Sequence, residues 1–281
     1  MIPLHLVSNP FPDSNWAPDM RPVVVIDGQS FSIKSLKSPL EGKVAYVVGV
    51  NQSSFEKLID YVRVESFHFY EMRVPNISSI LKCSGLTELA IHWNTKVEDI
   101  SPVSKVSNLK ALILEDTPKV RDLSPVGSCT KLEIFEFSGG IDSKNKAQSL
   151  EPISLLKSLR HLSLLNLKIE NGGLKPLAKL QDLLELHVSN QFPTEEYALL
   201  SVYLQNTKCS HFKSFIEIAN PIDGKNVMVI GSRKPFLNLE RDKEKIEKYT
   251  NEFQVLRKKI AANKRMQPDR RKPASRSSVD R

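Results

Sequence analysis

The chain has 281 residues, of which 40% are hydrophobic and 26% charged, and its formal net charge is +8. This length allows one elongated domain with caps or two compact domains. No apolar run approaches the roughly 18 residues that a membrane-spanning helix needs, which argues against membrane insertion. The first 16 residues contain no Lys or Arg, so a secretory signal is not expected. We therefore expect a cytoplasmic location.

Residues 1–62 are expected to form an N-terminal cap. Within them, Val23–Ile26 and Phe31–Ile33 flank an Asp-Gly turn signal, which predicts a hairpin. Residues 44–50 have the pattern of a strand, and residues 55–62 that of a helix that begins at a serine. This strand and helix are interpreted as a degenerate first repeat.

Two copies of one unit then follow each other, LTELAIHWNTKVEDISPVSKVSN from Leu86 and LKALILEDTPKVRDLSPVGSCTK from Leu109. Apolar residues at unit positions one, four and six predict a short strand with one buried face. Later apolar residues at three-residue spacing predict turns that pack back on that strand. One unit cannot cover its apolar face, but stacked neighbours can. Self-similarity at this period therefore predicts a solenoid.

The same frame extends over residues 63–206 and gives six units. Their apolar patterns begin, in chain order, at Val64, Leu86, Leu109, Leu132, Leu159 and Leu183. The fourth unit is longer than the others, and its extra polar residues, Asp142–Gln148, are expected to bulge from the outer rim as a loop. Three or more repeats suffice for a continuous core, so six do.

The unit that begins at Leu86 resembles the leucine-rich repeat of the internalin type. It matches the pattern LxxLxLxxNxIxDISPLxxLxx nearly throughout, with Asn94 at the asparagine position. The next unit has Thr117 there and the other four have no asparagine, so the continuous asparagine ladder of that family is expected to be mostly absent. The resemblance implies an α/β fold, a curved right-handed horseshoe with a parallel sheet on its concave face and caps at both ends. It also implies a protein-binding module without catalysis.

Residues 207–260 are predicted to cap the last repeat. Two strand-like runs, SFIEIA and VMVIGS, are separated by turn residues and predict a hairpin. From Asn238 the apolar residues follow helical spacing and form one stripe. We expect this helix to cover the edge of the sixth unit in a monomer. A coiled-coil dimer is the alternative, although the stripe is short for one.

The positive charge is concentrated at the C-terminus, where residues 257–281 hold ten basic and two acidic side chains. Residues 261–281 lack aromatic residues and apolar periodicity, which predicts disorder. One interpretation is a polybasic arm that binds nucleic acid, the alternative function for this chain. The other is that NKRMQPDRRKPAS resembles the translated recombination site at the ends of bacterial integron gene cassettes. On that interpretation the tail has no ligand.

Catalytic and cofactor motifs are absent from the sequence, which has no glycine-rich phosphate loop, His-Glu-x-x-His, Cys-x-x-Cys or Gly-x-Ser-x-Gly. The cysteines have no close pairing, and two of them fall on inward positions, which indicates core thiols in a reducing compartment. Four histidines fall on outward strand positions: His68, His92, His161 and His187. They occupy different rows and columns, so a metal site is not expected. We predict no enzyme and no cofactor.

The repeat register predicts an aromatic and acidic binding surface on the concave face. Strand positions three, five, seven and eight point away from the core. The candidate partner-binding residues at these positions are His68, Tyr70, Glu88, His92, Trp93, Glu115, Asp116 and Glu136. Tyr and Trp are frequent hot spots of interfaces, so Trp93 with Tyr70 and His92 is expected to anchor a partner protein that has a basic surface. Coverage of Trp93 by the N-terminal cap is the competing interpretation.

Overall fold

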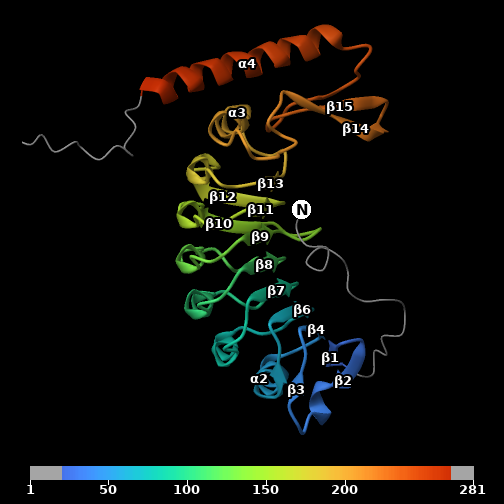
Figure 1. The fold of residues 1–281 in the computed structure, drawn as a ribbon. Coiled ribbons are helices and arrows are strands. Elements are labelled where there is room, and N and C mark those ends of the chain that lie inside the picture. The colour runs from blue at the N-terminus through green and yellow to red at the C-terminus, as the bar shows by residue number, and fades with distance from the viewer. Residues whose placement is uncertain (1–20, 267–281) are drawn as a thin grey trace, which may run out of the picture.

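The computed structural model describes residues 21–266, which form a stack of short strands with 3-10 turns on the opposite side (Figure 1). The largest sheet has nine strands in the order β13-β11-β9-β8-β7-β6-β4-β1-β2. Sequential repeats supply neighbouring strands, so the sheet grows by one strand per unit. The protein is a leucine-rich-repeat solenoid, as the repeat predicts.

Seven strands of this sheet pair in parallel and in register. They are β4 (Val44–Val48), β6 (Ser66–Tyr70), β7 (Glu88–His92), β8 (Ala111–Glu115), β9 (Ile134–Ser138), β11 (His161–Leu164) and β13 (Glu185–Val188). The unit leucines and their equivalents lie between the strands and the turns and are buried in one continuous core. The turns are η3 (Ser78–Lys82), η4 (Ser101–Lys105), η5 (Val126–Ser128), η6 (Ile153–Leu155) and η7 (Lys175–Lys179).

The N-terminal end of the sheet is closed by an antiparallel hairpin. Strand β1 (Val23–Ile26) pairs with β2 (Gln29–Ser32) on one side and with β4 on the other. Helix α2 (Gln52–Tyr61) follows β4 and takes the place of a 3-10 turn. The turn η2 (Ile33–Ser35) packs against α2. The short strands β3 (Leu40–Glu41) and β5 (Val62–Arg63) pair in parallel. Because β4 continues the register of β6, β4 and α2 form an additional, irregular unit.

The long fourth unit forms a strand where a rim loop was expected over Asp142–Gln148. Strand β10 (Asn145–Ser149) pairs in parallel with β12 (Leu167–Asn171) in a small second sheet. The expectation is wrong from Asn145 onward because two residues of this polar segment, Asn145 and Ala147, are buried. The Asn145 amide nitrogen donates to the Ser138 carbonyl at 2.8 Å, and its oxygen accepts from the Thr117 amide at 3.0 Å. Asn145 therefore satisfies buried backbone groups beside Thr117, the position at which the repeat lacks asparagine.

The C-terminal end of the solenoid is covered by a helix, a small sheet and a second helix. These are α3 (Thr194–Tyr203), the strands β14 (Phe215–Ile222), β15 (Lys225–Val229) and β16 (Phe236–Leu237), and α4 (Lys243–Met266). In Figure 1, α4 lies across α3 and the β14–β15 hairpin at the end of the stack. Phe253 of α4 is 1% exposed and belongs to the main core, whereas Ile246 packs against Val227 and Val229 of β15.

Helix α4 continues to Met266, six residues beyond the boundary at residue 260 that the sequence predicts. The prediction of disorder is therefore wrong for residues 261–266. The Lys264 ammonium donates to the Val202 carbonyl at 3.2 Å and lies 4.6 Å from the centre of the Tyr203 ring, so the last helical turn is attached to α3. The rest of the basic tail lies outside the described residues. None of the helices in residues 21–266 has the length and apolar character required to cross a lipid bilayer.

Candidate functional surface

The face of the large sheet that points away from the core, here called the concave face, carries side chains in columns because the parallel strands are in register. The first column is Val44, Ser66, Glu88, Ala111, Ile134, His161 and Glu185. The second column is Tyr46, His68, Ala90, Ile113, Glu136, Ser163 and His187. The third column is Val48, Tyr70, His92, Glu115 and Ser138. Residues 22 to 27 positions apart in the sequence thereby become neighbours.

Aromatic side chains gather at the N-terminal half of this face, as the register predicts. The rings of Tyr70 and His92 are stacked, with their centres 4.5 Å apart and their planes 6° apart. The Trp93 ring meets Tyr70 edge-on at 6.2 Å. In the second column, Tyr46 and His68 lie 5.1 Å apart. Burial raises the pKa of Tyr70 above its ordinary value, so its phenol is neutral at physiological pH.

The aromatic group is joined to the carboxylates through His92. Its Nδ1 atom lies 2.6 Å from Oε2 of Glu115, which belongs to the neighbouring strand. Glu136 follows on the next strand, and burial, to which the negative charge of Glu115 adds, raises its pKa. Farther along the face, Nδ1 of His161 lies 3.2 Å from Oε2 of Glu185. His92 and His161 thus each contact a carboxylate.

Three residues that directly follow strands adopt a left-handed backbone conformation. The φ angles are +53° for Glu71, +59° for Trp93 and +47° for Asp116. This conformation is uncommon for residues with a Cβ atom and is most costly for bulky ones. It occurs here because the chain bends away from the sheet at the same point of each unit. The carboxylate of Glu71 accepts a hydrogen bond from Arg21 at 2.5 Å, which ties the N-terminal hairpin to this edge.

The carboxylate of Asp116 has a local structural role. It accepts a hydrogen bond from the Ser143 hydroxyl. A Cβ atom added to Gly140 would lie 2.6 Å from the Asp116 carboxyl carbon, so the loop packs tightly on this side chain. Asp116, which the sequence predicted as a partner-binding residue, therefore holds the loop between β9 and β10.

The centre of the concave face is closed, and its edge is accessible. His68 is 0% exposed, so this candidate offers no surface to a partner, whereas Trp93 is 49% exposed. An apolar patch that was not expected from the sequence lies at the centre: Ala90, Ala111, Ile113 and Ile134. A signal for it was present, because both outward strand positions of the second copy, Ala111 and Ile113, are apolar.

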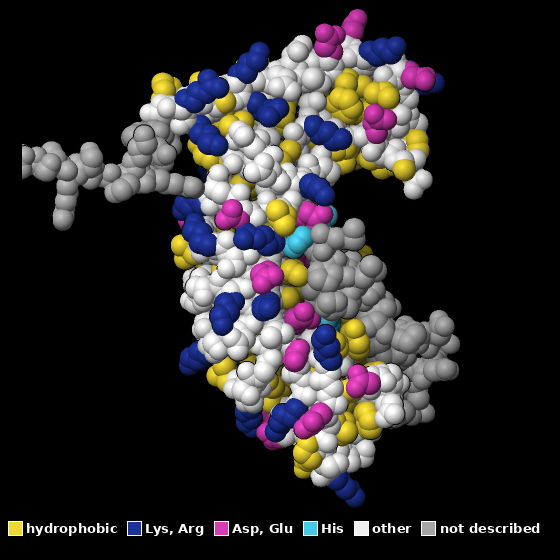
Figure 2. Space-filling model, in the orientation of Figure 1, with side chains coloured by type: hydrophobic (Ala, Val, Ile, Leu, Met, Phe, Trp, Pro, Cys, Tyr) yellow, Lys and Arg dark blue, Asp and Glu magenta, His cyan; other side chains and the backbone are white. Residues whose placement is uncertain are grey.

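The charge of the concave face is opposite to that of the whole chain. The three columns and the residues Glu71, Trp93 and Asp116 contain no Lys or Arg. They contain six carboxylates: Glu71, Glu88, Glu115, Asp116, Glu136 and Glu185. In Figure 2, Lys and Arg gather instead over α4 and along the side of the solenoid that carries the 3-10 turns.

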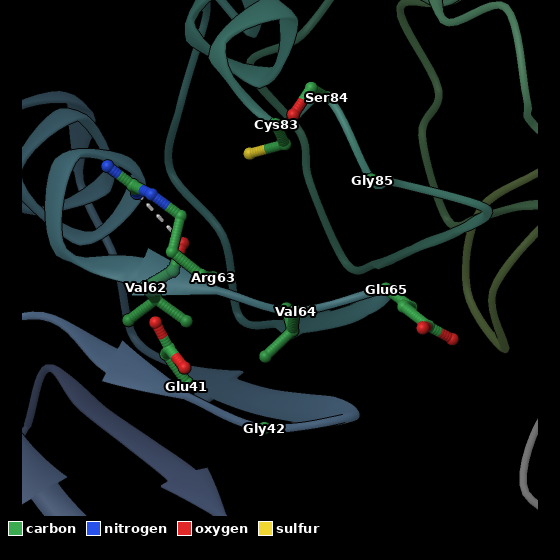
Figure 3. Close-up of a pocket in the computed structure, with 9 residues that line it drawn as sticks. All are labelled: Glu41, Gly42, Val62, Arg63, Val64, Glu65, Cys83, Ser84 and Gly85. Carbon is green, nitrogen blue, oxygen red and sulfur yellow. Dashed lines mark hydrogen bonds between the residues drawn. The ribbon is translucent and has the colours of Figure 1, made fainter.

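A groove of about 450 Å³ lies beside the N-terminal units (Figure 3). It is lined by Glu41, Gly42, Val62, Arg63, Val64, Glu65, Cys83, Ser84 and Gly85. Arg63 donates to the carbonyls of Ile59 and Asp60 at 2.9 Å, and thereby caps the end of α2. Figure 3 shows the carboxylates of Glu41 and Glu65 well apart from each other. The groove lacks the converging polar groups typical of a small-molecule site.

The described residues include no group of three His, Cys, Asp or Glu side chains arranged to hold a metal ion. The thiols of Cys83, Cys129 and Cys209 are unpaired. Burial raises their pKa values to about 11 in each case, so they are protonated and unreactive at neutral pH.

No protein-family model matches the chain, and no curated protein matches it. Among solved structures, internalin C2 of Listeria monocytogenes is similar over 58% of this chain and 68% of its own, with 18% identity and a TM-score of 0.46. The internalin InlF of the same species is similar over 64% and 69%, with 16% identity and a TM-score of 0.38. A chain of the mouse RP105/MD-1 complex is similar over 56% and 28%, with 24% identity and a TM-score of 0.43. The repeated unit and the parallel sheet in register give this chain the leucine-rich-repeat fold.

Proposed function

We propose that this protein is a non-catalytic binding module that holds a positively charged partner protein against its concave face. The observation that carries the proposal is the charge of that face, whose three columns hold four carboxylates and no Lys or Arg although the chain has a net charge of +8. A basic partner is attracted to this face and repelled by the basic side of the solenoid. Such a distribution orients an encounter and selects against acidic partners.

The aromatic residues supply the apolar part of the interaction. Trp93 is about half exposed and contacts Tyr70, and Tyr70 stacks on His92. Trp and Tyr give large rigid contact areas and are enriched among the residues that dominate binding energies. Glu115 lies beside them through its contact with His92, so a cationic side chain of the partner finds a carboxylate next to an apolar surface.

The proposal assigns no reaction to this face. His92 and His161 each contact a carboxylate, and within residues 21–266 neither is paired with a hydroxyl or thiol that it would activate. The stacked ring of His92 is held on one side by Tyr70, which suits a rigid contact surface.

The test uses random peptides displayed on phage and selected against the full chain, with affinities measured by fluorescence anisotropy. Selected peptides should be rich in Lys and Arg, and their affinity should fall as salt is added. The triple variant Glu88→Gln, Glu115→Gln, Glu136→Gln should lose affinity at least about tenfold.

A matched control removes the same number of charges away from the face, with Glu98→Gln, Glu151→Gln and Glu247→Gln. This control should bind as the wild type does. Equal losses in both triple variants would show that only net charge matters, and no loss in the concave-face variant would refute the proposal.

A further inference from the structure

We infer that the strongest contact of this interface is an apolar edge formed by Trp93, Ile141 and Leu165, which packs against apolar side chains of the partner protein. The inference rests on the proposed function and names the part of the surface that anchors the partner. The three side chains are exposed to different degrees, 49% for Trp93, 100% for Ile141 and 40% for Leu165. They remain accessible while the apolar patch at the centre of the face is buried.

These residues lie along one edge because each comes shortly after a strand of the parallel sheet. Backbone hydrogen bonds connect this edge from unit to unit. The Trp93 amide donates to the Glu115 carbonyl at 3.0 Å, and the Gly139 amide donates to the Leu165 carbonyl at 2.9 Å. Between them, the Asp116 amide donates to the Ser138 carbonyl at 2.8 Å. Three strand spacings separate Trp93 from Leu165, about 14 Å, so one partner can contact both.

The loop that presents Ile141 is fixed on both sides. Asn166 donates its amide hydrogens to the carbonyls of Gly140 at 2.6 Å and Ser143 at 3.1 Å. On the other side, the Ser143 hydroxyl donates to the carboxylate of Asp116. Gly139 has no room for a side chain, since a Cβ atom there would overlap the carbonyl oxygens of Asn166 and Ser143. Ile141 therefore projects from a loop whose shape is set before a partner arrives.

A fully exposed isoleucine contributes nothing to the core, and single exposed apolar residues are common. What distinguishes Ile141 is the fixed loop, because binding through a preorganised group loses little conformational entropy. Trp93 adds a second, independent observation. Glu71 and Asp116 share its left-handed conformation at the same point of their units, but at position 93 that conformation carries a bulky ring, for which it is most costly. Both positions retain a large apolar side chain where folding gives no reason for one.

The surroundings of the edge define the partner's chemistry. The Asp116 side chain contacts the loop through Ser143, and Glu115 directly precedes Asp116 in the chain. Asp142 is exposed and directly follows Ile141. The apolar side chains of the partner that contact Ile141 would therefore be flanked by Lys or Arg. A lipid surface is disfavoured, because these carboxylates are repelled by the anionic headgroups of a membrane. The inference therefore commits to a protein.

The experiment uses the peptides selected against the full chain. Ile141→Ser should reduce their affinity at least about tenfold without changing the melting temperature, and Ile141→Leu should restore most of it. Ser143→Ala, which removes the contact with Asp116 on one side of the loop but keeps Ile141, should produce a smaller loss. The matched control is Ile222→Ser, the same substitution at an isoleucine that is 53% exposed at the end of β14, and it should bind as the wild type does.

The outcomes separate this inference from the proposed function. If Ile141→Ser binds normally while the concave-face triple Gln variant does not, the edge is not the anchor and the acidic face remains the binding surface. If neither variant loses affinity, or if no peptide is enriched, both ideas fail. Sedimentation with vesicles of phosphatidylcholine and phosphatidylserine tests the alternative ligand. Vesicle binding that Ile141→Ser abolishes would overturn the assignment to a protein partner.

Discussion

The imidazole of His92 joins an aromatic residue of the concave face to a carboxylate, because its Nδ1 atom lies 2.6 Å from the carboxylate of Glu115 while its ring stacks on Tyr70. His92 and Glu115 are 23 positions apart in the sequence and become neighbours through the register of β7 and β8. The contact holds one negative charge of the face close to its aromatic group. Glu136, on the strand after Glu115, lies in the field of the same carboxylate.

Glu136→Gln should raise the free energy of unfolding at pH 7. Burial, with a further contribution from Glu115, raises the pKa of Glu136 in the native state above its value in the unfolded chain. The folded protein therefore disfavours the ionised carboxylate, and this penalty is present when the pH is above the folded-state pKa. It disappears as the pH falls below the unfolded value near 4.3, where both states are protonated.

Urea unfolding of both proteins at pH 7 and at pH 4 measures this effect. The stability gain of Glu136→Gln should shrink in acid, whereas Glu98→Gln on the outer surface should show no such trend. A variant that is less stable than the wild type at pH 7 would contradict the assignment. Because the same carboxylate attracts the partner, Glu136→Gln should be more stable and should bind selected peptides more weakly.

Trp93→Gly should leave the protein as stable as the wild type, or more stable by about 1 kcal/mol, while it removes about 2 kcal/mol or more of binding energy. Glycine adopts the left-handed conformation of this position without steric cost. Trp93→Ala is the matched control, since it removes the ring but keeps the Cβ atom that makes the conformation unfavourable. It should lose the same affinity without the gain in stability. Thermal unfolding combined with peptide anisotropy compares the two, and a marked destabilisation by both would mean that Trp93 supports the fold.

The repeat frame predicted the solenoid, the strands and the buried positions because a unit that repeats its apolar residues has to stack. It also predicted which residues share the concave face, since the alternation of side chains along a strand follows directly from the frame. It did not predict how accessible they are. His68 and Trp93 both occupy outward positions, yet His68 is buried and Trp93 is half exposed. Exposure depends on the surroundings of each position, which no local pattern records.

The loop of the fourth unit shows the same limit. Its residues are polar, and polarity indicates solvent exposure when only the sequence is considered. The structure places Asn145 in the interior, where its side chain accepts from the Thr117 amide and donates to the Ser138 carbonyl. Ile141 was also unremarkable in sequence, since its significance depends on the contacts of Asp116 and Asn166 with the loop.

Phe253→Ala should destabilise the protein by roughly 3–5 kcal/mol, the usual cost of removing a buried phenylalanine ring. The ring is 1% exposed and joins α4 to the main core, so its loss leaves a cavity at the end of the solenoid. Val255→Ala, at a residue of the same helix that is 64% exposed, is the control and should change stability little. Denaturant unfolding measures the difference. A wild-type dimer that Phe253→Ala dissociates at unchanged stability would instead show that α4 pairs between chains.

Asn145→Ala should cost roughly 1–3 kcal/mol, because it leaves the Thr117 amide without a partner in the interior, while the Ser138 carbonyl keeps its hydrogen bond from the Asp116 amide. Asn108→Ala is a suitable control, since Asn108 is exposed and only accepts a hydrogen bond from Lys131.

Asn145→Asp separates the two functions of the amide. A carboxylate still accepts from Thr117, but its second oxygen faces the Ser138 carbonyl, so this variant should be at least as unstable at pH 7. In acid the protonated carboxyl can donate to that carbonyl, and the native state binds this proton more tightly than the unfolded chain does. The stability of Asn145→Asp relative to the wild type should therefore increase as the pH falls. Urea unfolding at several pH values checks this, and a pH-independent difference would show that the amide nitrogen of Asn145 is not an essential donor.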